Sequence, residues 1–138
     1  TDINPKVLKT AAAGIFPLSG MKQYSENYVH SGGTGYFSDY YTAHYQLVKL
    51  DEQLKKQLVF STHNLATDAS FNQFQLIICR NVLIYFDREL QSRVFTLFNN
   101  SLDTGSFLAL GSKETLRFTT VEAQYQKISL KEKIWQKL

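Results

Sequence analysis

The chain has 138 residues, of which 43% are hydrophobic and 14% aromatic, enough to fill one hydrophobic core. The net charge of +3 equals that of the last twelve residues, so the rest is neutral and does not predict a nucleic-acid-binding face. A single cysteine excludes an internal disulfide and fits a reducing cytosol. The longest apolar run, residues 82–86, is too short for a membrane span, and no signal peptide is expected. These features predict a soluble cytoplasmic protein.

The first predicted element is a helix. Asn4 is a good helix cap, Pro5 suits the first turn, and Gly14 is expected to end the helix. Residues 20–57 contain a Gly-rich and a Tyr-rich stretch and a possible strand at 45–50. We expect them to form a small β insertion.

Two apolar runs in the middle of the chain predict strands. Residues 58–64 end in polar side chains, and Phe74–Cys79 has the nearly continuous apolar pattern of a strand buried on both faces of a parallel sheet. Arg80 and Asn81 break this pattern abruptly. Ligands of open α/β sheets lie outside the carboxyl ends of the strands, so the break is where chemistry is expected.

A second helix and another strand follow. Asp87 is a suitable cap, and the apolar positions after it recur with helical spacing as far as Leu102. Residues 103–105 are expected to turn the chain into a buried strand at 107–110. Strand, helix and strand form a crossover unit with parallel strands, and residues 125–138 favour a final hairpin. The sequence therefore predicts an α/β fold.

The run Cys-Arg-Asn-Val-Leu-Ile-Tyr-Phe at residues 79–86 closely resembles the fourth-strand signature of the CheR-type chemotaxis-receptor glutamate methyltransferases. Residues 1–15 resemble the end of the family's second strand and the helix after it, and residues 60–65 resemble the end of its third strand. Residues 105–111 resemble its fifth strand. The resemblance implies a Rossmann-like class I methyltransferase sheet with a small antiparallel insertion and a C-terminal hairpin.

The resemblance also implies a set of residues that bind S-adenosylmethionine. Asp2 would accept hydrogen bonds from the two ribose hydroxyls, and Asn64 and Leu65 would read the adenine edge. Cys79 and Arg80 would line the methionine and adenosine side of the pocket. Without the resemblance, Asp2 could be a solvated terminal residue, Asn64 a turn former and Cys79 a structural thiol.

The candidate catalytic residues are Tyr85, whose hydroxyl would point toward the transferring methyl group, and Arg80. Taken alone, a tyrosine in this apolar run is more often a core residue. A glutamate acceptor has an unperturbed pKa of ~4.3 and is ionised at neutral pH, so the transfer needs no general base. Alignment and removal of water would suffice, with Arg80 or Tyr85 orienting the carboxylate. The three histidines lack metal-ligand spacing, and no metal is expected.

Three functions compete at this level. The resemblance implies a protein-glutamate O-methyltransferase with a methyl-accepting chemotaxis receptor as its partner and without membrane insertion. A non-catalytic signalling module that binds through residues 36–45 is the main alternative, and a methyltransferase acting on RNA is another. Retention of Asp2, Asn64, Arg80 and Tyr85 argues against the module, and the neutral body of the chain argues against RNA.

The resemblance covers only part of the family's domain. The glycine-rich loop that follows the family's first strand has no counterpart in residues 1–138, so weak cofactor binding by this chain is expected. Residues 111–114, Gly-Ser-Lys-Glu, replace the usual Gly-His-Ser-Glu, a modest departure. The family's first strand lies between the second and the fourth. Residues 76–79 are therefore expected to form an open edge, covered by a rearranged segment or prone to self-association.

Overall fold

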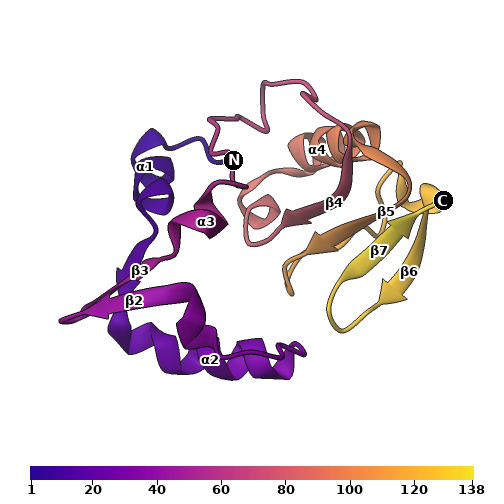
Figure 1. Cartoon of the computed structure of the whole chain (residues 1–138). Coiled ribbons are helices and arrows are strands. Elements are labelled where there is room, and N and C mark those ends of the chain that lie inside the picture. The colour runs from indigo at the N-terminus through magenta and orange to yellow at the C-terminus, as the bar shows by residue number, and fades with distance from the viewer. The chain divides into compact units, whose positions relative to one another are not determined.

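The computed structural model describes all 138 residues, which divide into two compact units, residues 1–64 and 65–138 (Figure 1). The first unit contains α1 (Pro5–Ala13), β1 (Ile15–Pro17), η1 (Leu18–Gly20), α2 (Met21–His30), η2 (Phe37–Tyr40), β2 (Tyr41–His44), β3 (Leu47–Leu50) and α3 (Glu52–Lys55). The second contains β4 (Phe74–Cys79), η3 (Leu83–Tyr85), α4 (Arg88–Ser101), β5 (Leu102–Leu110), η4 (Glu122–Gln124), β6 (Tyr125–Ser129) and β7 (Ile134–Lys137).

The first helix forms where the sequence predicts it. The Asn4 side chain accepts a hydrogen bond from the Lys6 N–H at 2.9 Å, and Pro5 occupies the first turn. Gly14 ends α1 with a φ of 66°, in the left-handed region that glycine adopts without steric cost.

The predicted small insertion is an antiparallel sheet with the strand order β1-β3-β2. The sequence indicated one strand at residues 45–50, whereas the structure has two strands joined by a turn at Tyr45 and Gln46. Tyr45 has a φ of 52°, which a continuous strand cannot accommodate. The sheet begins at Ile15, before the range expected for the insertion.

The strand predicted at residues 58–64 does not form, so this interpretation was wrong. The segment forms a single parallel β-bridge, between Thr62 and Asp2. A strand needs a ladder of backbone hydrogen bonds along its length, and Asp2 alone supplies the partner here. Val59, in the middle of the segment, is 89% exposed.

The second unit contains a four-stranded sheet with the order β4-β5-β7-β6. β4 and β5 are parallel and joined through α4, whereas β7 is antiparallel to both β5 and β6 (Figure 1). This arrangement confirms the predicted α/β fold, the crossover unit and the C-terminal hairpin. Residues 103–106 form an irregularity in β5, since Phe74 pairs with Leu102 but Leu76 pairs with Phe107.

The core of this unit lies between α4 and one face of the sheet. Asp87 caps α4 by accepting a hydrogen bond from the Leu90 N–H at 2.9 Å, as predicted. Buried side chains from α4 and the sheet then form one cluster, which includes Val94, Phe95, Phe98, Leu108 and Trp135. The packed helix therefore fixes the position of the loop that precedes it.

The opposite face of the sheet is open, which corrects the expectation that β4 is buried on both faces. Leu76 is 52% and Ile78 is 65% exposed, whereas Cys79 is buried with the core. Alternating strand residues point to opposite faces, and α4 covers one face. Phe107 on β5, which pairs with Leu76, is also exposed.

None of the helices has the length and apolar character that a membrane span requires.

Candidate active site

In the first unit, backbone pairing places Asp2 beside the segment that leads to Asn64. The Asp2 N–H donates to the Ser61 carbonyl at 3.3 Å, and the His63 N–H donates to the Asp2 carbonyl at 3.2 Å. Asn64 follows directly and is half-buried. The structure therefore brings together the two residues of this unit that the sequence assigns to the cofactor.

The Asp2 side chain suits the role of binding vicinal hydroxyls. It is half-buried, and its Oδ1 accepts a hydrogen bond from the Asn4 N–H at 2.8 Å, which fixes its direction. An ionised carboxylate has about four acceptor positions, so further acceptor capacity remains for two ribose hydroxyls. The remaining acceptor positions of Asp2 thus fit the two hydroxyls of the ribose of S-adenosylmethionine.

In the second unit, Cys79 is a member of the core cluster and Leu65 packs against that cluster. Leu65 packs partly buried against the core cluster, and Cys79 is buried at the carboxyl end of β4. Burial, and secondly the Glu114 carboxylate, raise the pKa of the Cys79 thiol to about 12. The thiol is therefore neutral at physiological pH and is not a nucleophile.

Arg80 and Tyr85 lie on the turn that follows β4, and both are exposed. Asn81 reverses the chain with a φ of 59°, and the Tyr85 N–H then donates to the Val82 carbonyl at 3.2 Å. Tyr85 is 80% exposed, which excludes the interpretation that it is a core residue. The catalytic roles of the two side chains remain predictions.

The sequence assigned no role to Glu114, yet this residue organises the turn. Glu114 is 4% exposed, and its Oε1 accepts hydrogen bonds from Val82 N–H at 2.9 Å and Leu83 N–H at 2.8 Å. Its Oε2 accepts from the Gly111 N–H at 2.6 Å. An acidic residue three positions after the glycine that follows β5 was the available signal.

Gly111 leaves room for this contact. A Cβ atom at position 111 would lie 2.7 Å from Glu114 Oε2 and 2.9 Å from the Asn81 backbone nitrogen. Real Cβ atoms do not approach other heavy atoms so closely. The loops after β4 and β5 are therefore in close contact at Gly111, and any side chain at this position would push the two loops apart.

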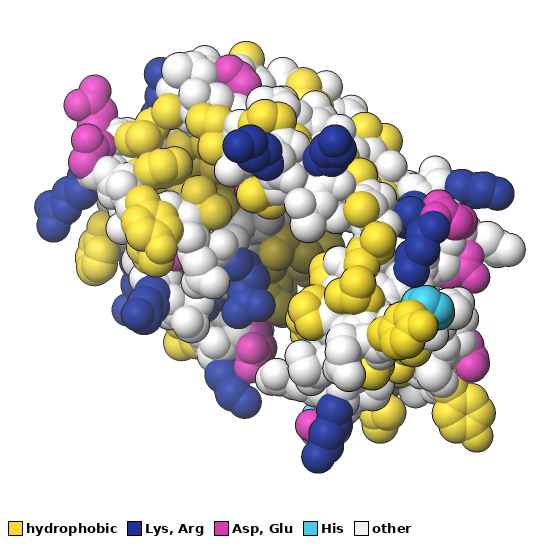
Figure 2. Space-filling view, turned by 90° about the vertical axis from the view of Figure 1, so that its left-hand side faces the viewer, with side chains coloured by type: hydrophobic (Ala, Val, Ile, Leu, Met, Phe, Trp, Pro, Cys, Tyr) yellow, Lys and Arg dark blue, Asp and Glu magenta, His cyan; other side chains and the backbone are white.

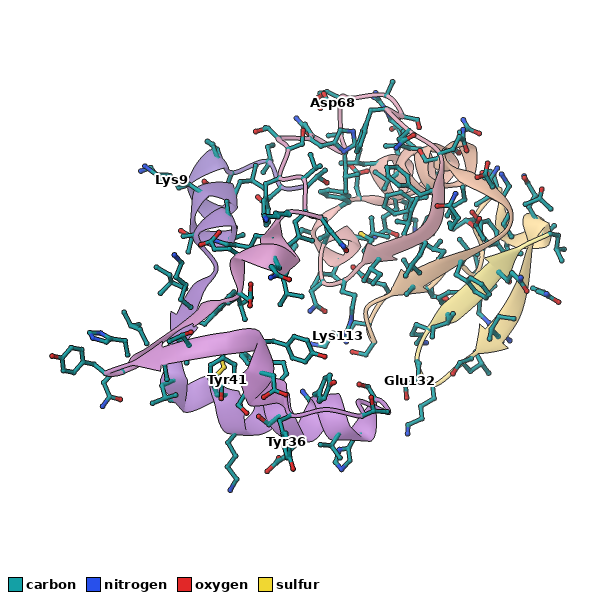
Figure 3. All side chains as sticks on the ribbon, viewed as in Figure 1. Lys9, Tyr36, Tyr41, Asp68, Lys113 and Glu132 are labelled. Carbon is teal, nitrogen blue, oxygen red and sulfur yellow. The ribbon has the colours of Figure 1, made fainter.

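A small pocket of about 200 Å³ lies beside this turn. Its lining includes Leu83, Gln91, Phe95, Lys113 and Glu114. Lys113 marks the turn after β5 in Figure 3. None of the residues that the sequence assigns to the cofactor lines this pocket, so it does not represent the predicted cofactor site.

A basic patch on the surface would be evidence for a nucleic-acid partner. On the face drawn in Figure 2, lysine and arginine side chains lie scattered among acidic and apolar ones, without a continuous basic stripe. A phosphate backbone is bound by clustered cations. The absence of a nucleic-acid partner stays a prediction from the sequence.

The parallel β4–α4–β5 unit, with a polar turn at the carboxyl end of β4, defines an α/β fold of the methyltransferase type. The family model described as "CheR methyltransferase, SAM binding domain" matches residues 1–134. The chain therefore belongs to the CheR methyltransferase family. S-adenosylmethionine, the cofactor that the sequence predicts, is the one that this description names.

Individual relatives agree with this assignment. A Pseudomonas putida protein whose name marks it as a candidate methyltransferase, Cher3, is 42% identical over 99% of this chain. Chemotaxis protein methyltransferases of Listeria monocytogenes and Borreliella burgdorferi are 34% and 32% identical over 84% and 85% of the chain. These alignments cover 50%, 41% and 40% of the respective relatives, so the chain spans half of their length or less.

Proposed function

We propose that the protein containing this chain transfers a methyl group from S-adenosylmethionine to glutamate carboxylates of a chemotaxis receptor in the cytoplasm. The product would be a glutamate methyl ester. The observation that carries this proposal is the turn after β4, which holds Arg80 and Tyr85 exposed at the carboxyl end of the strand in a chain of the CheR family. In this proposal residues 1–138 are part of a cofactor-binding domain, with residues 20–57 as an insertion.

The residues of this chain would act mainly by binding and alignment. The bound cofactor supplies a methyl group that is already activated on a sulfonium. Asp2 would hold the ribose, Asn64 and Leu65 the adenine, and the end of β4 the methionine side. The Arg80 guanidinium would attract the acceptor carboxylate and orient it, because a guanidinium can bind both carboxylate oxygens. The Tyr85 hydroxyl would complete the alignment.

The proposal predicts a specific chemical product. The full-length protein, incubated with methyl-labelled S-adenosylmethionine and a methyl-accepting receptor fragment, should label that fragment. Mild alkali should release the label as methanol, because esters hydrolyse under conditions in which N-methyl groups are stable. Receptor fragments with the acceptor glutamates replaced by alanine serve as controls. Alkali-stable label, or none with any receptor, would contradict the proposal.

The chain alone should bind the cofactor more weakly than the full-length protein. In this proposal Asp2, Asn64 and Arg80 would each contribute only part of the contacts to the cofactor, and the chain spans half of its relatives' length or less. Calorimetric titration of S-adenosylmethionine into both proteins measures this difference. Asp2→Ala in the full-length protein should also weaken binding relative to the unmodified full-length protein. Equal affinity of the two proteins would show that residues 1–138 contain the complete site.

A further inference from the structure

The turn after β4 presents the two predicted catalytic side chains but has few hydrogen-bond partners of its own. Its short helix η3 has no side-chain cap from Val82, the residue that precedes it. The internal bonds are Tyr85 N–H to the Val82 carbonyl and Phe86 N–H to the Leu83 carbonyl, at 3.2 and 3.1 Å. The remaining backbone groups must be satisfied from outside, because buried unpaired groups are costly.

Glu114 satisfies the amide side of this turn. It accepts the N–H groups of Val82 and Leu83 with one oxygen and that of Gly111 with the other. All three partners are N–H donors, and both carboxylate oxygens act as acceptors, so the side chain matches the hydrogen-bonding needs of the site. Glu114 comes from the turn after β5, next to the labelled Lys113 in Figure 3. The hydrogen bonds of the buried Glu114 side chain therefore connect the loop after β4 with the turn after β5.

Gln91 satisfies the carbonyl side. Its Nε2 donates to the Leu83 carbonyl and to the Phe86 carbonyl, both at 2.9 Å. Gln91 is half-buried in the first turns of α4, whose packing against the core fixes its position. The turn is thus held from one side by a carboxylate and from the other by an amide, on two different elements.

We propose that Glu114, together with Gln91, is a positioning residue for methyl transfer. The inference rests on the proposed function and adds residues that act through Arg80 and Tyr85 without contacting the substrate. Glu114 bonds Val82 and Leu83, which lie two residues from Arg80 and from Tyr85 respectively. A shift of the turn therefore moves both side chains. Misplacement of reacting groups by ~1 Å costs on the order of a hundredfold in rate.

The test is Glu114→Gln in the full-length enzyme. An amide has one accepting oxygen and places an NH₂ group against the remaining N–H, so one anchor of the turn is lost. We expect the transfer rate at saturating cofactor and receptor, per folded molecule, to fall about tenfold to hundredfold. Cofactor affinity should change far less than the rate. Amide hydrogen exchange of residues 81–86 should become faster.

Glu122→Gln is the matched control. The Glu122 carboxylate also accepts a backbone hydrogen bond, from the Phe118 N–H at 2.7 Å, but this bond lies within residues 118–122 and not in the turn after β4. Its replacement should leave both the transfer rate and the exchange of residues 81–86 unchanged. An equal loss of activity in both variants would overturn the inference, because any weakened turn would then suffice.

Gln91→Met decides the question if Glu114→Gln does not fold. Methionine keeps the length of the side chain but removes both bonds to the carbonyls of Leu83 and Phe86. A lower rate with faster exchange in residues 81–86 supports the inference. Full activity per folded molecule in either variant overturns it and leaves the proposed function intact. A wild-type protein that methylates no receptor would overturn the proposed function and this inference with it.

Discussion

Cys79 and Tyr85 lie in the same short signature but in opposite environments. The Cys79 side chain ends β4 inside the core, where burial keeps its thiol neutral. Tyr85 lies on the turn after β4 and is exposed to solvent. The difference follows from Asn81, whose positive φ turns the chain away from the strand direction between them. Neighbouring residues of one short motif can therefore have different roles, some in packing and others at the exposed turn.

Tyr85→Phe should lower the rate of methyl transfer with almost no change in stability. The exposed side chain contributes little to packing, so the melting temperature of the full-length enzyme should stay within a degree or two, as expected for surface substitutions of about 0.5 kcal/mol or less. Loss of the hydroxyl should remove an aligning contact. Tyr24→Phe, at a partly exposed tyrosine on α2, is the control and should leave the rate unchanged. Reduced stability with unaltered specific activity would assign Tyr85 to packing.

Tyr125→Phe should stabilise the protein slightly at neutral pH and more at alkaline pH. The Tyr125 hydroxyl is buried without a hydrogen-bond partner, and its removal should raise the free energy of unfolding by about 1 kcal/mol. Burial also raises the pKa of Tyr125 from 10.0 to about 12. Above pH 10 the unfolded chain therefore loses this proton first, and wild-type stability falls as the pH rises toward 12.

Urea unfolding at pH 7 and between pH 10 and 12 measures this difference. The gap between Tyr125→Phe and wild type should widen with pH, because phenylalanine does not titrate. Tyr45→Phe, at an exposed tyrosine of the β2–β3 turn, controls for the loss of a hydroxyl as such. A Tyr125→Phe protein that is less stable than wild type at pH 7 would show that the hydroxyl has a bound partner.

At the scale of elements, the sequence predicts what local interactions determine. Asn4, Gly14 and Asp87 fix the ends of two helices through contacts with near neighbours in the chain, so α1 and α4 lie where expected. Residues 58–64 failed as a strand because pairing depends on a distant partner, and Asp2 supplies a single bridge.

The same distinction explains the candidate site. The resemblance named Arg80 and Tyr85 from a local signature, and the structure places both on an exposed turn. Glu114 was missed because its contacts reach residues 31 and 32 positions away in the chain. The open face of β4 was missed because the nearly continuous apolar run of residues 74–79 favours burial on both faces, whereas the structure covers only one.

Lys137 of strand β7 caps the C-terminal end of α4. The Lys137 Nζ donates to the carbonyls of Asn99 and Leu102, both at 2.7 Å, where α4 passes directly into β5. A cation is favourable at this negative end of the helix dipole. Lys137→Met should therefore lower the free energy of unfolding by about 1–2 kcal/mol, from a charged hydrogen bond and the dipole together.

Chemical denaturation of the two lysine variants of one hairpin tests this role. Lys127→Met, on the neighbouring strand β6, removes the same charge at an exposed position and should cost little. If both substitutions lower stability equally, the effect of Lys137 is one of general charge and not of helix capping.

For the whole molecule, the open edge of the four-stranded sheet is the feature that bears on self-association. β4 is the terminal strand of the order β4-β5-β7-β6, so no strand of its unit pairs with its other edge. The exposed side chains Leu76 and Ile78 lie on the same strand. An apolar strand with unpaired N–H and C=O groups is a template for pairing with another chain.

We therefore expect residues 1–138, prepared alone, to self-associate through β4. Light scattering over a concentration series should show a mass that rises with concentration. Ile78→Lys should reduce the association, because a charge on an edge strand opposes pairing. Phe118→Lys changes a side chain that is 96% exposed but lies outside the sheet, so it should have little effect. A monomer at every concentration would mean that the edge of β4 is not a pairing surface. Equal relief by both variants would instead indicate general hydrophobic association.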